Sequence, residues 1–394
     1  MQRCIKMTGK APTILYLVTE DWYFVLHRLP IARQAYNNGC RIIVVTRIGE
    51  YGELLEKENF EVENLDWERK SVNPVQALLD LRKIKDIYDR YRPDIVHHIA
   101  IKPSIFGSIV ALRSGPQCIV NNLAGLGSVF SDKGLRNRIQ RFILMASFRI
   151  LFKQSNTVTI VENRDDRDFL LKRIGLTADS VALIRGIGVN TAIFDCSPEP
   201  EGKPVVTMVS RLLWSKGVGI LVEAARILVS RGASVTIRLV GTPDISNRDT
   251  VSEEQLQRWN DEGVVEWVGH KDDIAQTWRN TNIAVLPSYY REGVPRTLLE
   301  AASCCRALIT TDMPGCREIV QHGVNGLLVP PQDPHALADA IEKLIGEPQL
   351  RSRMGLAGRS LVEKEFSEDY VVRETYALYE RLLTIQKGSG YVWH

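Results

Sequence analysis

The sequence lacks the long apolar run that a membrane-spanning helix requires. None of its 394 residues lies in an uncharged apolar stretch of about 18 residues, so no spanning helix is expected. Residues 1–10 contain three basic side chains but no apolar core, and we expect no secretory signal there. The 44% hydrophobic and 25% charged fractions are ordinary for a globular chain, which excludes a disordered or fibrous protein.

The cysteines show no metal-binding pattern. There are seven, an odd number, and the only close pair is Cys304 and Cys305, which cannot form a CxxC motif. We therefore expect reduced thiols, as is usual in a cytosolic protein.

Both common glycine motifs for phosphate binding are absent. The pairs Gly125/Gly127 and Gly217/Gly219 each lack the third glycine of a GxGxxG motif, and no GxxxxGK[ST] sequence occurs. These absences argue against an NAD-dependent enzyme and against a P-loop nucleotidase.

Acidic residues are nearly absent from one segment of the first half. Between Ile95 and Val161 the only acid is Asp132, among eight Lys and Arg residues. Residues 1–190 carry 28 Lys and Arg against 20 Asp and Glu, a net charge of +8, whereas residues 191–394 carry 22 against 27, a net charge of −5. The first half therefore favours an anionic partner.

Short apolar segments alternate with helical segments along the whole chain. This alternation is typical of parallel sheets covered by helices on both faces, and we predict an α/β fold of two Rossmann-like doubly wound domains facing across a cleft. The predicted strands of the first half are residues 13–18, 41–45, 94–97, 118–120 and 157–161. Those of the second half are residues 204–209, 235–240, 265–268, 283–286 and 307–310.

A Gly- and Pro-rich stretch at residues 186–202 separates the two series of strands and is the predicted hinge. We place one domain at residues 1–188 and a second at residues 203–365. A terminal helix at residues 366–385 is expected to cross back to the first domain.

Polar residues gather where one strand of the second half ends. The predicted strand ends at Leu286, and Glu292 lies in the loop before a helix whose first turn suits Pro295. Backbone N–H groups at residues 294–297 would then suit a phosphate.

A second carboxylate, Glu300, lies one helical turn beyond Arg296 and Thr297 and shares their face. Glu292 and Glu300 could hold two different polyhydroxylated groups. A helix-dipole partner and a solvated surface acid would show the same spacing.

Two cations follow the first strand of the second half. Arg211 and Lys216 lie in a loop at the carboxyl edge of the predicted sheet. Two such cations beside a helix N-terminus suit a diphosphate leaving group, although a charged surface loop is the plainer alternative.

Together these segments resemble the retaining GT-B glycosyltransferases of family 4. The resemblance covers nearly the whole chain and is strongest in residues 204–333, which include EGVPRTLLEA at 292–301 and GVNGLLVPPQD at 323–333.

The resemblance implies a role for each of the four charged residues. Arg211 and Lys216 would bind the donor diphosphate, Glu292 the donor sugar and Glu300 the nucleotide ribose. We predict catalytic roles for Glu292, Arg211 and Lys216. Donor contacts are predicted for Gly241, Gly293, Val294, Pro295, Arg296, Thr297, Leu298 and Glu300.

The first half is similar to bacterial members that extend undecaprenyl-diphosphate-linked sugars, through LAGLGSVF at residues 123–130. We predict acceptor contacts at Lys102, Gly125 and Gly127. One departure is the first loop, TEDWYF at residues 19–24, where many members carry a pair of glycines.

Two further features bear on the chemistry. His97 and His98 close a predicted strand at a cleft-facing position. A histidine here resembles a family position near the reacting centre, and this resemblance implies a catalytic role for His98. One buried and one surface histidine is the structural alternative. Asp166 and Asp168 form a DxD sequence that could hold a metal, but a predicted helix start explains them better. We expect no metal and no cofactor besides a nucleotide-sugar co-substrate.

Residues 135–152 combine arginines with aromatic and aliphatic side chains, which fits a helix lying in a lipid headgroup layer. A core helix with a basic edge is the alternative. The predicted membrane contacts are Arg136, Arg138, Arg141, Phe142, Met145 and Phe148.

We predict a retaining transferase that moves a hexose or N-acetylhexosamine from a UDP-sugar to a polyprenyl-diphosphate-linked saccharide in bacterial glycan assembly. The first domain would bind the acceptor and the membrane, and the second the donor. The protein would be cytoplasmic, peripheral on the anionic inner face of the plasma membrane, with no nucleic-acid partner. The alternatives are a UDP-sugar epimerase on the same fold and a non-catalytic membrane scaffold.

Overall fold

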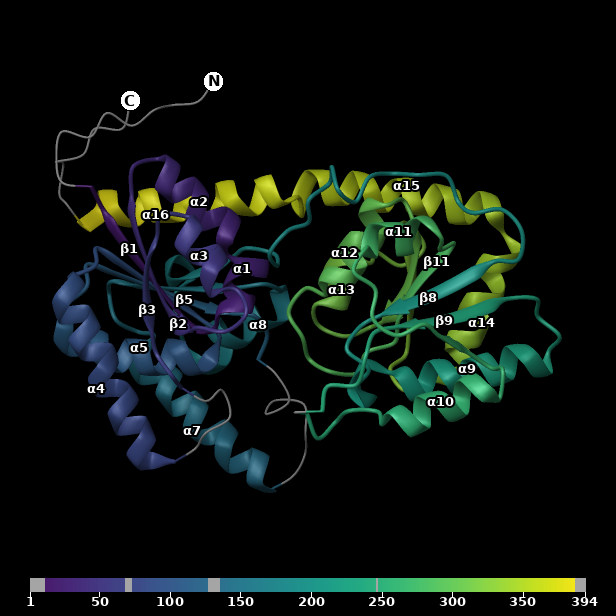
Figure 1. Cartoon of the computed structure of the whole chain (residues 1–394), viewed down its shortest axis with the longest axis horizontal. Coiled ribbons are helices and arrows are strands. Elements are labelled where there is room, and N and C mark those ends of the chain that lie inside the picture. The colour runs from purple at the N-terminus through teal and green to yellow at the C-terminus, as the bar shows by residue number, and fades with distance from the viewer. Residues whose placement is uncertain (1–10, 68–72, 127–134, 246, 387–394) are drawn as a thin grey trace. The chain divides into compact units, whose positions relative to one another are not determined.

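The computed structural model describes residues 11–67, 73–126, 135–245 and 247–386. The chain divides into two compact units (Figure 1). The first comprises Met1–Ile187 with Val371–His394, and the second comprises Gly188–Tyr370. Residues 188–202, which the composition suggested as part of a hinge, belong to the second unit.

The first unit contains a seven-stranded parallel sheet in the order β3-β2-β1-β4-β5-β6-β7. Chain order reverses between β1 and β4, which are neighbours in register from Ile14–Ile95 to Leu17–His98. The strands are β1 (Thr13–Glu20), β2 (Arg41–Arg47), β3 (Glu61–Asn64), β4 (Ile95–Ile99), β5 (Cys118–Leu123), β6 (Thr157–Val161) and β7 (Val181–Leu183).

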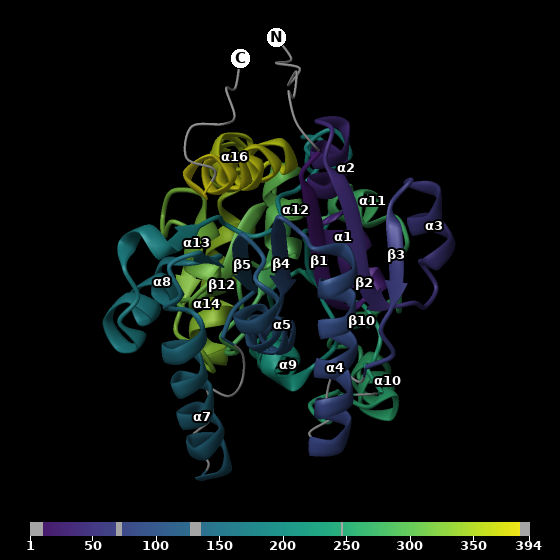
Figure 2. The ribbon, with the colours of Figure 1, turned by 90° about the vertical axis from the view of Figure 1, so that its left-hand side faces the viewer.

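Helices cover both faces of this sheet. Figures 1 and 2 show α2 and α16 on one side of the sheet and α4, α5 and α7 on the other. The helices are α1 (Asp21–His27), α2 (Leu29–Asn37), α3 (Gly52–Lys57), α4 (Pro74–Tyr91), α5 (Ile101–Ser114), α7 (Leu135–Leu151) and α8 (Arg164–Phe169). Helix α16 (Glu368–Gln386) belongs to the first unit from Val371 onward.

The second unit contains a six-stranded parallel sheet in the order β10-β9-β8-β11-β12-β13. Here chain order reverses between β8 and β11. The strands are β8 (Val205–Val209), β9 (Thr236–Val240), β10 (Glu266–Trp267), β11 (Ile283–Leu286), β12 (Ala307–Thr311) and β13 (Gly326–Val329).

The core of the second unit lies between this sheet and the helices on its two faces, with α9 packed on α14 and α12 on α15. Fully buried aliphatic residues such as Val206, Leu221 and Leu299 fill it. The helices are α9 (Val218–Ser230), α10 (Glu253–Asp261), α11 (Ile274–Arg279), α12 (Arg296–Ser303), α13 (Cys316–Ile319), α14 (Pro334–Gly346) and α15 (Pro348–Glu365).

The two parallel sheets confirm the predicted α/β class with two doubly wound domains. Three strands were not predicted, namely β3, β7 and β13. Strand β3 has the sequence EVEN and lies at a sheet edge, so it shows no apolar run. Strand β7 has only three residues and carries no usable periodicity.

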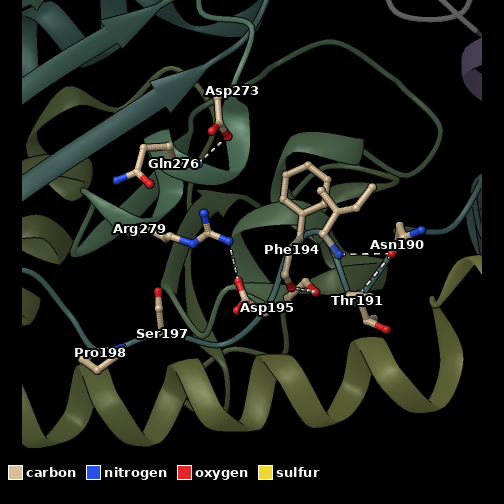
Figure 3. Close-up of polar contacts among 12 residues, drawn as sticks. Asn190, Thr191, Phe194, Asp195, Ser197, Pro198, Asp273, Gln276 and Arg279 are labelled. Atoms are coloured by element: carbon tan, nitrogen blue, oxygen red, sulfur yellow. Dashed lines mark hydrogen bonds and ion pairs between the residues drawn. The ribbon is translucent and has the colours of Figure 1, made fainter.

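Residues 190–199, which we call the linker segment, are held by polar contacts within the second unit (Figure 3). The side-chain oxygen of Asn190 accepts from the N–H groups of Ala192 and Ile193 at 3.0 and 3.1 Å. Asp195 pairs with Arg279 at 2.8 Å. Arg306 donates to the Ser197 carbonyl at 2.7 Å. Hydrogen bonds and an ion pair therefore hold the linker segment against the second unit, while the boundary between the units, at Ile187 and Gly188, lies within the predicted hinge.

A disulfide between Cys196 and Cys305 corrects the expectation of reduced thiols. The two residues are 109 positions apart, and the linker segment brings Cys196 to the end of α12. No spacing rule could have indicated this pair. Cys40, Cys118, Cys304 and Cys316 are buried and take no part in this disulfide.

We expect reduction of this disulfide to destabilise the protein by about 2–4 kcal/mol, because the bond closes a long loop in the unfolded chain. Thermal unfolding with and without dithiothreitol measures the change. Cys196→Ser should lower Tm and abolish the effect of the reductant.

Cys304→Ser is the matched control, since burial raises the pKa of the Cys304 thiol to about 12 and keeps it out of exchange. It should leave the effect of dithiothreitol unchanged. Alkylation of all seven cysteines in unreduced, denatured protein would contradict the disulfide.

Candidate active site

A cluster of polar residues in the second unit lies at the reversal point between β8 and β11. Connections that leave neighbouring parallel strands in opposite directions open a crevice at the carboxyl ends of those strands, where ligands commonly bind. The loop after β8 contains Arg211 and Lys216, and the loop after β11 contains Glu292. Fold topology thus brings together residues that are far apart in sequence.

Lys216 and Glu292 form an ion pair between Nζ and Oε2, with side chains only 16% and 11% exposed. The two loops are also tied through their backbones, because the Tyr289 N–H donates to the Ser215 carbonyl at 3.0 Å. The ammonium group is therefore held in a defined place at low exposure, where its interaction with a charged ligand is weakly screened.

Glycines allow these loops to approach one another. Gly217 has a φ of 86°, and a Cβ there would lie 2.1 Å from the Pro287 carbonyl oxygen. Gly241 has a φ of 137°, and its Cβ would lie 2.0 Å from the Ser210 carbonyl oxygen. Any larger residue at either position would push the loop after β8 out of place. Close backbone packing therefore accounts for Gly241, which was predicted as a donor contact.

Arg211 lies farther out than Lys216. Its side chain is 56% exposed, and its Nη1 pairs with Asp244 Oδ2 at 3.0 Å. Asp249 holds the turn before Lys216, accepting hydrogen bonds from the N–H of Ser215 at 3.1 Å and from its hydroxyl. Sequence reasoning missed both aspartates. The signal was present, since a polar loop at residues 242–250 follows β9 at the same sheet edge.

Helix α12 begins at Arg296, with Pro295 as its N-cap. The predicted row of N–H donors at residues 294–297 is wrong in one place, because proline has no N–H. The N–H of Leu298 bonds to the Pro295 carbonyl at 3.2 Å, and the Leu298 side chain lies in the core. The first-turn donors of α12 belong to Arg296 and Thr297.

Glu300 is buried and lies on the same helix face as Arg296, as its spacing predicted. Arg296 donates from Nε to Glu300 Oε1 at 2.9 Å. Burial raises the pKa of Glu300, while the Arg296 guanidinium opposes that shift. The Arg296 guanidinium thus offsets part of the cost of burying the Glu300 carboxylate, and Glu300 is not the solvated acid that its spacing alone allowed.

Comparison with known families places the chain. The family described as "Glycosyl transferases group 1" matches residues 189–361, and "Glycosyl transferase 4-like" matches residues 13–162. The capsular polysaccharide biosynthesis glycosyltransferase CapM of Staphylococcus aureus is 30% identical over 86% of this chain and 90% of its own length. The chain belongs to the group 1 glycosyltransferases. This result confirms the family that was predicted from the sequence. It also confirms the prediction that the protein is a glycosyltransferase.

A second relative of this glycosyltransferase comes from Campylobacter jejuni. It is the N,N'-diacetylbacillosaminyl-diphospho-undecaprenol alpha-1,3-N-acetylgalactosaminyltransferase, 27% identical over 90% of this chain and 95% of its own length. Solved structures share the fold. Sucrose-phosphate synthase of Thermosynechococcus elongatus superposes with a TM-score of 0.78 at 21% identity, covering 95% of this chain and all of that one. Anabaena HepE, solved with UDP and glucose, gives 0.75 at 20% identity, covering 93% and 99%.

In the first unit of the glycosyltransferase, His98 is not placed for catalysis. The residue is fully buried, and its Nε2 lies 2.8 Å from the Tyr88 hydroxyl. Its Nδ1 lies 2.7 Å from Asn121 Oδ1, and burial lowers its pKa to about 4. The hydrogen bonds of its two ring nitrogens thus join β4 to α4 and to β5 inside the first unit. This finding corrects the predicted catalytic role. His97 is buried on the other face, 2.5 Å from the Tyr379 hydroxyl of α16.

The predicted acceptor contacts are only partly described. Lys102 lies in the first turn of α5, with Nζ 5.2 Å from the Trp67 ring centre and 3.9 Å from Asp80. These partners direct it toward α4. Gly125 lies in the loop after β5 with a φ of 92°, and Gly127 lies outside the described residues. Their acceptor role stays a prediction.

The DxD sequence is a helix start, as predicted. Asn163 caps α8 by accepting from the Asp166 N–H at 2.7 Å. Asp166 is buried against the Asn163 side chain, and Asp168 pairs with Lys172 at 2.6 Å. Each carboxylate is therefore used within the helix.

Helix α7 has a core face and an exposed face. Phe148 is fully buried and stacks on Phe152 with ring centres 4.7 Å apart, and Met145 packs against the same cluster. Phe148 is therefore a core residue, which corrects its assignment to the membrane. Met145 is only partly buried, and its membrane contact stays a prediction. Phe142 is 71% exposed, beside exposed Ile139 and Ile143.

Three arginines of α7 were predicted to contact the membrane, and the structure describes the side chains of two of them. Arg138 is exposed and Arg141 partly exposed, whereas the side chain of Arg136 lies outside the described residues. Among the described helices, none combines the length and apolarity needed to cross a bilayer.

Proposed function

We propose that this glycosyltransferase moves a hexose or N-acetylhexosamine from a UDP-sugar to a polyprenyl-diphosphate-linked saccharide, with retention at the anomeric carbon. The observation that carries the donor half is the Lys216–Glu292 pair at the reversal point of the second sheet. An ammonium held there can neutralise the charge that develops on a departing diphosphate. The Campylobacter relative, which acts on a diphospho-undecaprenol sugar, supports the acceptor half.

The proposed step transfers one glycosyl group and one proton. An acceptor hydroxyl attacks the anomeric carbon from the face that the leaving group occupies, and the bond from that carbon to the diphosphate oxygen breaks. UDP leaves with the electron pair, and its phosphate takes the hydroxyl proton. Lys216 and Arg211 stabilise the leaving charge, Glu292 binds a sugar hydroxyl, and Glu300 with Thr297 contacts the nucleotide.

An anionic membrane surface is the second proposed partner, and α7 supports it. Its exposed Ile139, Phe142 and Ile143 lie next to Arg138 and Arg141. Helix α4 adds exposed apolar side chains near its own N-terminus, Val75, Leu78 and Leu79. Helix α5 contacts both α4 and α7, and Figures 1 and 2 show α4 and α7 extending in the same direction. Apolar side chains mixed with arginine suit the headgroup layer of the inner leaflet.

UDP release tests the proposed reaction against an epimerase. With a matching UDP-sugar, release should require the lipid-linked saccharide and should equal the amount of product formed. An epimerase would change its UDP-sugar, or release UDP, without an acceptor. Acceptor-independent conversion would therefore overturn the proposal.

Activity is expected to survive EDTA, because Lys216, Arg211 and the α12 N-terminus supply the positive charge that a metal provides in other enzymes. The measurement compares initial rates before and after dialysis against the chelator. Complete loss that Mn²⁺ or Mg²⁺ restores would show that a metal takes part.

A further inference from the structure

An aromatic cluster with one exposed member, Trp22, lies at the carboxyl end of β1. Trp22 is 38% exposed, and its ring centre lies 5.6 Å from that of Tyr23 and 6.4 Å from that of His27. Tyr23 and His27 are 4.3 Å apart and meet edge to face. The exposed face of the Trp22 indole is apolar area that a ligand could cover, with a gain in hydrophobic free energy.

Trp22 is held in a rigid place. The neighbouring Asp21 is buried, and its carboxylate accepts from the N–H groups of Trp22 at 2.7 Å, Gly49 at 2.6 Å and Tyr51 at 3.0 Å. These bonds fasten the start of α1 to the loop after β2. Glu20 adds an ion pair to Arg47 at 2.7 Å. The indole is thus presented by a fixed backbone, which lowers the entropy lost when a ligand binds.

The position of Trp22 is also informative. It follows β1, which lies at the reversal point of the first sheet between β2 and β4. Ligands of doubly wound sheets bind outside the carboxyl ends of the strands at this point. The same point carries the Glu20–Arg47 pair, which offers both an acceptor and donors for hydroxyl groups.

We propose that Trp22 is a stacking platform for a pyranose ring of the acceptor saccharide. The polarised C–H bonds on one face of a pyranose are complementary to the negative face of an indole, and the stack removes apolar area of both from water. Neighbouring Glu20 and Arg47 contact the hydroxyls at the ring edge. This places a specificity determinant where the sequence departs from the glycine pair that many family members carry. The saccharide class rests on the proposed function.

Fluorine NMR of protein labelled with 5-fluorotryptophan tests the platform directly. Trp22→Phe assigns the Trp22 signal by its disappearance. Titration with methyl glycosides of N-acetylglucosamine and N-acetylgalactosamine should shift that signal selectively. Shifts confined to other tryptophan signals, or no shift up to the solubility of the glycosides, would overturn the proposal.

Kinetics give a second readout. Trp22→Ala should raise the acceptor KM about tenfold, whereas Trp22→Phe should raise it less and the donor KM should not change. The matched control is Tyr36→Ala, since Tyr36 is 40% exposed near the end of α2 and meets Phe60 edge to face. Equal increases of the acceptor KM in Trp22→Ala and Tyr36→Ala would contradict the proposed stacking role of Trp22.

These experiments distinguish failure of the Trp22 platform from failure of the proposed acceptor. If the lipid-linked saccharide is not glycosylated but free glycosides still shift the Trp22 signal, the platform stands and the proposed acceptor falls. If the lipid is glycosylated and Trp22→Ala leaves its KM unchanged, the platform falls and the proposed function stands.

Discussion

Lys216→Ala is expected to lower kcat by about 10²–10³-fold, equivalent to about 2.7–4 kcal/mol, as when one preorganised donor is lost from a charge-stabilising site. The reason is the position of its ammonium at low exposure beside Glu292. Donor affinity should fall less than the rate, because negative charge on the diphosphate grows toward the transition state. Initial rates over a range of donor concentrations separate the two effects.

Lys216→Ala also leaves the Glu292 carboxylate without its ion pair, which could cause harm unrelated to catalysis. Thermal unfolding detects such harm, and Lys216→Ala should be slow at temperatures where it is still folded. Arg226→Ala, which breaks an exposed pair with Glu262 in the same unit, is the control and should keep the wild-type rate. A wild-type rate in Lys216→Ala would remove this residue from the mechanism.

Phe142→Glu is expected to weaken binding to vesicles rich in anionic lipid by about 100-fold. The change removes an aromatic side chain that could enter the lipid, worth about 1.5–3 kcal/mol, and adds a charge that the surface repels, worth about 1 kcal/mol. Sedimentation with vesicles at two salt concentrations measures the loss. Turnover of a short, water-soluble acceptor analogue should be nearly unchanged, because the residues proposed to bind the donor lie in the other unit.

Two controls give this experiment its meaning. Val229→Glu introduces the same charge at an exposed apolar position on α9 of the second unit and should leave vesicle binding unchanged. Phe148→Ala should instead lower stability by about 3–5 kcal/mol, since Phe148 is fully buried. Equal loss of turnover on soluble and lipid acceptors by Phe142→Glu, with vesicle binding intact, would assign this face to the acceptor rather than to the membrane.

The placement of Arg211, Lys216 and Glu292 at one edge of the second sheet was predictable because strand order and residue type agree there. Apolar strands ended before Arg211, Lys216 and Glu292, and parallel strands bring their carboxyl ends to one edge. Their pairing partners were not predictable in the same way. Asp249 acts through its hydrogen bonds to Ser215, which depend on how the loop after β9 folds back.

The wrong predictions for Phe148 and His98 arose where the sequence pattern allowed the side chain to point either into the core or out of it. Residues 135–152 carry apolar side chains around most of the helix, so periodicity could not decide that Phe148 faces the core and Phe142 faces outward. Adjacent strand residues point to opposite faces, but both faces of this sheet are covered. His97 and His98 are therefore both buried, one under α16 and the other against α4.

The central claim is transfer of a sugar from a UDP donor to a lipid-linked saccharide, and the mass of the lipid product tests it most directly. Purified protein would be offered a panel of UDP-hexoses and UDP-N-acetylhexosamines with a short polyprenyl-diphosphate saccharide. The account predicts a lipid heavier by one hexose or N-acetylhexosamine residue, with the anomeric configuration of the donor retained in its NMR spectrum. An unchanged lipid with every donor, or a product of inverted configuration, would contradict it.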